Sequence, residues 1–139
     1  MTNVLPIDAL AMAIFHYEGQ KPTDRNMRNN NPGNLRASPL PNAKDAGGYC
    51  VFESFGVGWA ALLEDISRQF AGDENTRLGP TSTLYQFFEV YAPARDHNWP
   101  LAYAHFVAAW LTEALERPIA TSSTLAEIQG GSNVPPKTT

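Results

Sequence analysis

Hydrophobic side chains recur every three or four residues in four stretches of the chain, which is the spacing of one helix face. The first stretch predicts a helix over residues 6–18, because Pro6 suits an opening turn and Gly19 suits a C-cap. The same spacing predicts helices at about residues 57–70, 82–91 and 100–115. The positions expected to face inward are Leu10, Ala13, Ile14, Tyr17, Leu62, Leu63, Ile66, Phe70, Leu84, Phe87, Phe88, Tyr91 and some of Tyr103, Phe106, Val107, Trp110 and Leu111.

Between the first two helices the pattern is irregular. Residues 20–48 are rich in proline, glycine and asparagine, which predicts loops and turns. Alternation over residues 49–53 indicates a short strand, although the run is brief. Near the end, Thr124 and Glu127 have the spacing of a capping box, which predicts a short last helix closed by Gly130.

We therefore expect a mainly α fold, in which one compact helical domain over residues 1–129 holds an irregular, partly β segment. Residues 130–139 have the composition of a flexible tail.

Composition and charge limit the kinds of partner and site that this chain is expected to have. The chain has 139 residues and a net charge of −4, so it shows no broad basic surface for nucleic acid or anionic membranes. The longest apolar run near the start, residues 9–15, is too short to cross a bilayer, and no secretory leader is visible. Cys50 is the single cysteine, which excludes an internal disulfide, and we expect it in the core. The three histidines lack metal-site spacing, so we expect no metal and no cofactor.

Glu18 is the most suggestive carboxylate, because it ends the first predicted helix. The unpaired carbonyls of a helix C-terminus disfavour an ionised side chain, and partial burial acts in the same direction. Both effects would raise the pKa of Glu18 and leave a protonated acid, which cleavage of a glycosidic bond requires. On the residues alone, an exposed glutamate that happens to precede a C-cap glycine is the more ordinary interpretation.

The asparagines of the irregular segment have two interpretations. Asn29, Asn30, Asn31 and Asn34 offer donors and acceptors that suit hydroxyl and acetamido groups. Asparagine also tolerates left-handed backbone, so the same residues suit turns. Aromatic side chains would supply faces for stacking on sugars, with core packing as the default. The candidates are Phe52, Trp59, Tyr91, Trp99 and Tyr103.

Four strings of this sequence together resemble a family of lysozyme-like peptidoglycan glycosidases and lytic transglycosylases of bacteria and their phages. They are "AIFHYEG", "RNNNPGNLR", "GGYCVFESFGVGWAALLEDI" and "YAPARDHNWPLAYAHFV", and the resemblance spans about residues 7–111. The second string is the most specific. Members of this kind are similar in plan to goose-type lysozymes, with the catalytic glutamate at a helix end. The Gly-Leu-Met-Gln string of better-known transglycosylases is absent from this chain, which leaves the subfamily open.

The resemblance implies roles for particular residues. Glu18 takes the role of the catalytic acid and base, and Asn30, Asn31 and Asn34 shape a cleft beside it, walled by Phe52 and Tyr91. Asp96 would order the loop that follows Tyr91. The bond cleaved is the β-1,4 linkage of peptidoglycan between N-acetylmuramic acid and N-acetylglucosamine, by hydrolysis as in a muramidase or by transglycosylation. Glu53 and Asp96 are candidates for a second carboxylate.

The resemblance leaves a competing class of function open. A binding module or virion structural piece would hold glycan strands in the same cleft without cutting them. For either class we expect a monomer made in a bacterial cytoplasm and delivered to the cell wall by a phage particle, lysis or secretion machinery. An endolysin of a bacteriophage fits this expectation.

Overall fold

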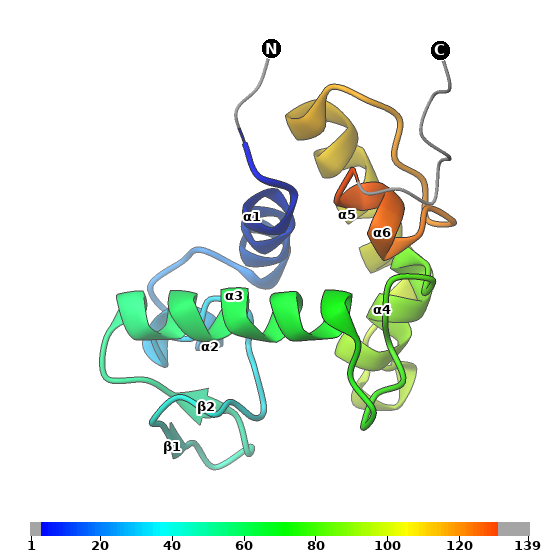
Figure 1. Cartoon of the computed structure of the whole chain (residues 1–139). Helices are drawn as coiled ribbons and strands as arrows, with labels where there is room; N and C mark the ends of the chain where they lie inside the picture. The colour runs from blue at the N-terminus through cyan, green and yellow to red at the C-terminus, as the bar shows by residue number, and fades with distance from the viewer. Residues whose placement is uncertain (1–3, 131–139) are drawn as a thin grey trace, which may run out of the picture. The chain divides into compact units, whose positions relative to one another are not determined.

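The computed structural model describes residues 4–130, which are mainly helical with one small sheet (Figure 1). In chain order, the helices and strands are α1 (Pro6–Glu18), α2 (Arg25–Arg28), β1 (Ala43–Lys44), β2 (Cys50–Val51), α3 (Phe55–Ala71), α4 (Leu84–Tyr91), the 3-10 turn η1 (Ala94–Asp96), α5 (Pro100–Leu115) and α6 (Leu125–Ile128).

Local sequence signals predicted the longer helices well. α1 and α5 have the predicted bounds, and the opening proline of each lies in its first turn. α3 is slightly longer at both ends than predicted. α4 begins at Leu84 because Thr83 is its N-cap, with both hydrogen bonds of a capping box to Gln86. The capping box predicted at Thr124 and Glu127 is confirmed at the start of α6.

The irregular segment contains more structure than its composition predicted. α2 is a single turn, and β1 pairs antiparallel with β2, with Ala43 opposite Val51 and Lys44 opposite Cys50. The prediction of loops throughout residues 20–48 was therefore wrong at these two places. β2 is also shorter than the strand predicted over residues 49–53. The pairing joins two-residue strands across a turn, so neither strand has enough periodicity of its own to be recognised.

Most positions predicted to face inward are buried, and Cys50 lies in the core as expected. Tyr17 departs from the prediction, because it is 38% exposed. Phe106 belongs to the α5 positions of which only some were expected to be buried, and it is 37% exposed. Leu63, Tyr91 and Trp110 are half-buried. Leu63, Phe106 and Trp110 lie towards the edges of their helices' apolar stripes, where a period of 3.6 residues separates buried from exposed positions least sharply. Tyr17 and Tyr91 lie on the apolar stripe, but in the last turns of α1 and α4.

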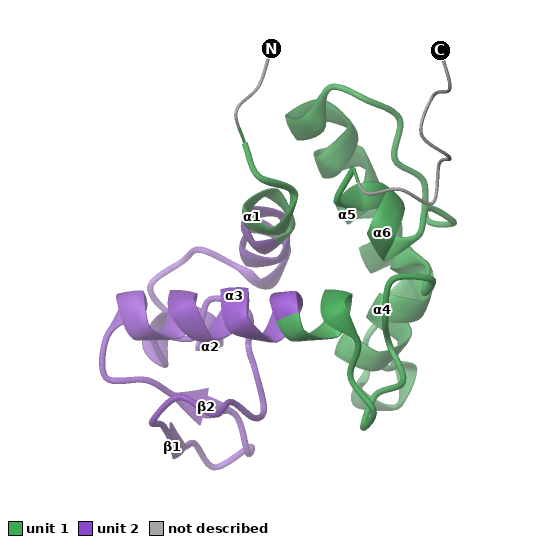
Figure 2. Cartoon of the chain, in the orientation of Figure 1, with its two compact units in different colours: residues 1–10, 68–139 green, residues 11–67 purple. Residues whose placement is uncertain are grey.

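The chain divides into two compact units (Figure 2). Unit 2 comprises residues 11–67, and unit 1 comprises the residues before and after it. The boundaries fall inside α1 and α3. The single domain expected over residues 1–129 stays a prediction. The tail expected over residues 130–139 lies outside the described residues, apart from Gly130.

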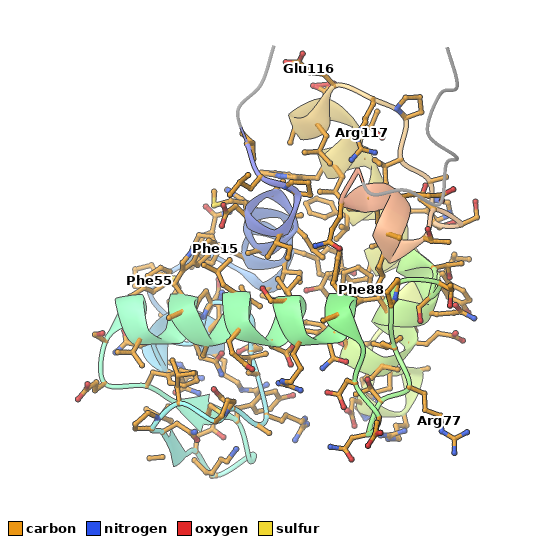
Figure 3. The ribbon with its side chains drawn as sticks, in the orientation of Figure 1. Phe15, Phe55, Arg77, Phe88, Glu116 and Arg117 are labelled. Atoms are coloured by element: carbon orange, nitrogen blue, oxygen red, sulfur yellow. The ribbon has the colours of Figure 1, made fainter. Side chains whose placement is uncertain are left out.

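Unit 1 is built around the packing of α4 on α5. The ring of Phe88 stacks on that of Tyr103, with the ring centroids 4.3 Å apart, and both side chains are buried. After α5 the chain turns at Glu116, whose φ is 56°. The guanidinium of Arg117 then donates hydrogen bonds to the backbone oxygens of Glu127 and Ile128 (Figure 3). These bonds satisfy carbonyls at the end of α6 and hold the last helix in unit 1.

Unit 2 joins the end of α1 to the start of α3 through aromatic packing. Phe15 and Phe55 lie next to each other in Figure 3, with their ring centroids 5.6 Å apart in an edge-to-face arrangement. Trp59, one turn further along α3, packs on both rings. These contacts place the last turn of α1 beside α3. Within residues 4–130, every helix is too short or too polar to cross a lipid bilayer.

Candidate functional site

Glu18 is the last residue of α1, and the backbone turns sharply directly after it. The amide N–H of Gly19 donates to the carbonyl of Phe15 at 3.2 Å, and Gly19 has a φ of +135°, a value that side-chain-bearing residues rarely adopt. A Cβ at Gly19 would also lie 2.4 Å from Oδ2 of Asp24. Gly19 is therefore required for the turn that leaves Glu18 half-buried at the helix end.

Asn34 binds the Glu18 carboxylate directly. Its Nδ2 donates to Oε1 of Glu18 at 2.8 Å. The backbone of Asn34 is left-handed, with a φ of 51°, and its amide N–H donates to the carbonyl of Asn31. Its Oδ1 is buried and finds no hydrogen-bond partner among residues 4–130. The turn therefore points one amide at the carboxylate, and that amide keeps an unpaired acceptor beside it.

The side chain of Asn31 has a structural role. It is fully buried, and Nδ2 donates to the carbonyls of Leu35 at 2.9 Å and Cys50 at 3.0 Å. Its Oδ1 accepts the backbone N–H of Leu35 at 2.9 Å. Both amide hydrogens are used, so Asn31 holds the turn against β2 and has no hydrogen left to offer a ligand.

Two neighbouring amides also act within the protein. Asn30 donates to the carbonyl of Phe52 at 3.1 Å, and Asn29 donates to Oδ2 of Asp45 at 2.9 Å. The Asp45 carboxylate accepts the backbone N–H of Tyr49, then the Asn29 amide and the N–H of Gly47, and these bonds hold its pKa below the ordinary value. The turn-building interpretation of the asparagines is thus the one that most of these contacts support.

Asn26 is a site residue that the sequence pattern did not reveal. It is fully buried on α2, and its Nδ2 donates to the carbonyl of Gly19 at 2.7 Å and to that of Pro32 at 3.2 Å. One side chain therefore connects the residue after Glu18 to the turn formed by residues 29–34, which we call the asparagine turn. The only sequence signal was its membership of an amide-rich string, because its partners lie seven and six residues away in irregular backbone.

Helix α3 packs directly against the asparagine turn. A Cβ built on Gly58 would lie 1.8 Å from the carbonyl oxygen of Asn30. The backbone of α3 therefore touches the backbone of the turn, with no room for a side chain between them.

Two of the predicted sugar-contacting aromatics are enclosed by protein. Phe52 is 2% exposed and Tyr103 is 1% exposed, so both rings belong to the core. The expectation that Phe52 walls a cleft is therefore corrected, since a ring enclosed by protein offers no face to a sugar. Core packing, which the sequence analysis gave as the default for these aromatic residues, is confirmed for both.

Tyr91 and Asp96 belong to unit 1, whereas Glu18 and the asparagines belong to unit 2. Tyr91 is half-buried at the end of α4 and stacks on Phe87, with their ring centroids 5.5 Å apart. Asp96 ends η1 and is also half-buried. The structure brings together Glu18, Asn30, Asn31 and Asn34 within one unit, while the roles expected for Tyr91 and Asp96 stay predictions.

The charge of Glu18 affects its neighbour Tyr17. Partial burial, followed by the negative charge of Glu18, raises the pKa of the Tyr17 hydroxyl above its ordinary value. Among residues 4–130, no three histidine, cysteine, aspartate or glutamate side chains are grouped so that they would hold a metal ion. What the described residues offer is one carboxylate at a helix end, oriented by a side-chain amide.

Comparison of this chain with protein-family models, with curated proteins and with solved structures found no match.

Proposed function

We propose that this protein cleaves the β-1,4 glycosidic bond between N-acetylmuramic acid and N-acetylglucosamine in peptidoglycan, with Glu18 as general acid and then base. The hydrogen bond from Asn34 to Glu18 carries the proposal. It joins two strings of the family resemblance, "AIFHYEG" and "RNNNPGNLR", through one contact at the carboxylate.

The contact also suggests which oxygen transfers the proton. Oε1 of Glu18 accepts from Asn34, so Oε2 carries the proton that passes to the glycosidic oxygen as the bond to the muramyl anomeric carbon breaks. The carboxylate left behind is stabilised by the Asn34 amide, because hydrogen bonds to ionised groups are stronger than those to neutral ones. Glu18 then takes a proton from water or from the muramyl 6-hydroxyl as that oxygen attacks the anomeric carbon, and the enzyme returns to its starting state.

The nucleophile decides the product. Water gives a reducing muramyl end, as in a muramidase, and the 6-hydroxyl gives a 1,6-anhydro ring, as in a lytic transglycosylase. The second route needs only one enzymic carboxylate. We favour it because Asn34 orients the Glu18 carboxylate at the end of α1, and this route needs no second one. Mass spectrometry of the products distinguishes the routes.

Replacement of Glu18 by glutamine tests the proposal. The purified Glu18→Gln variant should lose activity on cell walls by roughly 100-fold or more, since the amide cannot donate an acidic proton. Activity is measured as turbidity loss and as released muropeptides. Glu113→Gln, which changes an exposed glutamate of α5 in unit 1, is the matched control and should keep wild-type activity.

Near-wild-type activity of Glu18→Gln would refute the role of Glu18. Glu53→Gln and Asp96→Asn then test the two remaining carboxylates proposed from the sequence. The alternative function is a glycan-binding module without catalysis. Wild-type protein that sediments with cell walls but releases no muropeptides would support that alternative.

A further inference from the structure

A pocket of about 340 Å³ lies within unit 1, and none of its lining residues belongs to the proposed active site. Its volume is at the lower end of the roughly 300–1,000 Å³ typical of ligand sites. It lies where α4, through Tyr85 and Glu89, faces the loop before α5 and the first turn of that helix. The lining residues are Tyr85, Glu89, Ala94, Asn98, Trp99, Pro100, Leu101 and Ala102.

The apolar part of the pocket is unusually open to solvent. Trp99 is 76% exposed, and Tyr85 and Leu101 are also exposed. The fold makes little use of the Trp99 side chain, because Trp99 is the N-cap of α5 without a side-chain cap bond and contributes its backbone carbonyl to Tyr103. An indole that neither packs in the core nor caps a helix is a candidate for binding a ligand.

The polar part of the pocket combines two kinds of hydrogen-bonding group. Glu89 offers acceptors only, whereas Asn98 offers both a donor and an acceptor. Within residues 4–130, the Asn98 side chain makes only a long bond, from Nδ2 to the carbonyl of Pro93 at 3.4 Å. A sugar hydroxyl both donates and accepts, so it matches this pair. An ammonium group only donates and has no use for the Asn98 amide hydrogens.

We propose that this pocket is a second glycan-binding site, which takes one pyranose ring on the face of Trp99. The C–H groups of a pyranose face carry partial positive charge and suit the negative face of an aromatic ring. Hydroxyl groups at the ring edge bind Glu89 and Asn98. The choice of N-acetylglucosamine as the sugar rests on the proposed function, whereas the pocket and its chemistry do not.

Binding of N-acetylglucosamine trisaccharide to the Glu18→Gln protein, followed by ligand-observed NMR, tests the site without cleavage. Saturable binding is expected, and Trp99→Ala should weaken it by roughly tenfold or more, as truncation of a central aromatic contact does. Phe106→Ala is the matched control, because Phe106 is an exposed aromatic of α5 that does not line the pocket. It should leave binding unchanged.

Equal binding by Trp99→Ala and the parent protein would overturn the inference. The inference is also overturned if lysine binds in place of the trisaccharide and Glu89→Gln abolishes that binding, since this pattern indicates an ammonium site. Failure of the proposed function gives a different result. In that case the wild-type protein does not cut cell walls, but it still binds the trisaccharide through Trp99. Loss of cleavage in Glu18→Gln together with unchanged binding in Trp99→Ala would support the proposed function and refute the second glycan-binding site.

Discussion

Asn31 and Asn34 lie three positions apart in one turn, and their amides have different surroundings. All the hydrogens of the Asn31 amide bind backbone carbonyls, whereas the Asn34 amide reaches the Glu18 carboxylate. The left-handed backbone of Asn34 makes this possible, because it turns the side chain away from the direction that a helical or extended residue would give it. At this scale, one amide out of the cluster is in place to affect chemistry.

Asn34→Gly separates that chemical role from a structural one. Glycine accepts a φ of 51° without strain, so the turn should persist while the bond to Glu18 is lost. A hydrogen bond to a charged group contributes about 2 kcal/mol, so kcat should fall by roughly 30-fold, with little change in KM. The alkaline limb of the pH profile, on which activity falls as Glu18 loses its proton, should move to higher pH, because the carboxylate loses a donor. Steady-state kinetics on cell walls from about pH 4 to 8 measure all three.

Arg77→Gly is the control for the backbone change. Arg77 has a φ of 64° in the loop after α3, and its side chain points away from the protein in Figure 3. This variant should keep the wild-type pH profile. If Asn34→Gly lowers the melting temperature and leaves the pH profile unchanged, the positioning role is wrong.

At the scale of elements, the asparagine turn depends on the close approach of α3. Gly58→Ala places a Cβ 1.8 Å from the carbonyl oxygen and 2.9 Å from the carbonyl carbon of Asn30, and both are backbone atoms that cannot rotate away. Overpacking of this kind costs about 3 kcal/mol, so the free energy of unfolding should fall by that amount. Urea unfolding followed by circular dichroism provides the measurement.

Gly56→Ala is the matched comparison within the same helix. Its Cβ would meet Ser54 Oγ at 3.9 Å, an ordinary contact. Alanine favours helix by up to about 1 kcal/mol over glycine, so this variant should be as stable as wild type or slightly more stable. Equal stability of the Gly58 and Gly56 variants would show that α3 does not press on the turn as described.

At the scale of the whole molecule, each unit contains an aspartate whose charge the fold stabilises. The pKa of Asp45 in unit 2 is lowered first by the backbone N–H of Tyr49 and next by the Asn29 side chain. The pKa of Asp73 in unit 1 is lowered by the backbone N–H of Asn75, then by the Arg68 side chain. Both groups therefore favour the folded state only when they are ionised.

The sign of the pH dependence follows from these directions. A lowered pKa in the folded state contributes stability above the ordinary value of 3.8, and that stability is lost as the pH falls through the folded-state pKa. Urea midpoints should therefore drop from about pH 5 to pH 2. Asp45→Asn and Asp73→Asn should each lower stability at about pH 6 and make the acid decline shallower. An equally steep decline in the double variant would contradict this account.

The sequence by itself determined what depends on near neighbours. The bounds of α1 and α5, the capping box of Thr124 and Glu127 and the place of Glu18 before a glycine all follow from interactions within about four residues, which spacing records directly. The family resemblance placed Asn30, Asn31 and Asn34 in a cleft beside Glu18 by analogy. The contact between the side chains of Asn34 and Glu18 came only from the structure.

Tertiary structure decided which residues contact each other over longer separations, because the sequence does not show which group a side-chain amide binds. Asn26 connects Gly19 to Pro32, Asn31 binds Leu35 and Cys50, and Phe52 is enclosed, although each of these residues was also compatible with a place at the surface. β1 and β2 form only when a turn brings two short strands together. Partners separated by many residues of irregular backbone leave no period in the sequence, so only the folded chain shows which amides are used internally and which one faces the carboxylate.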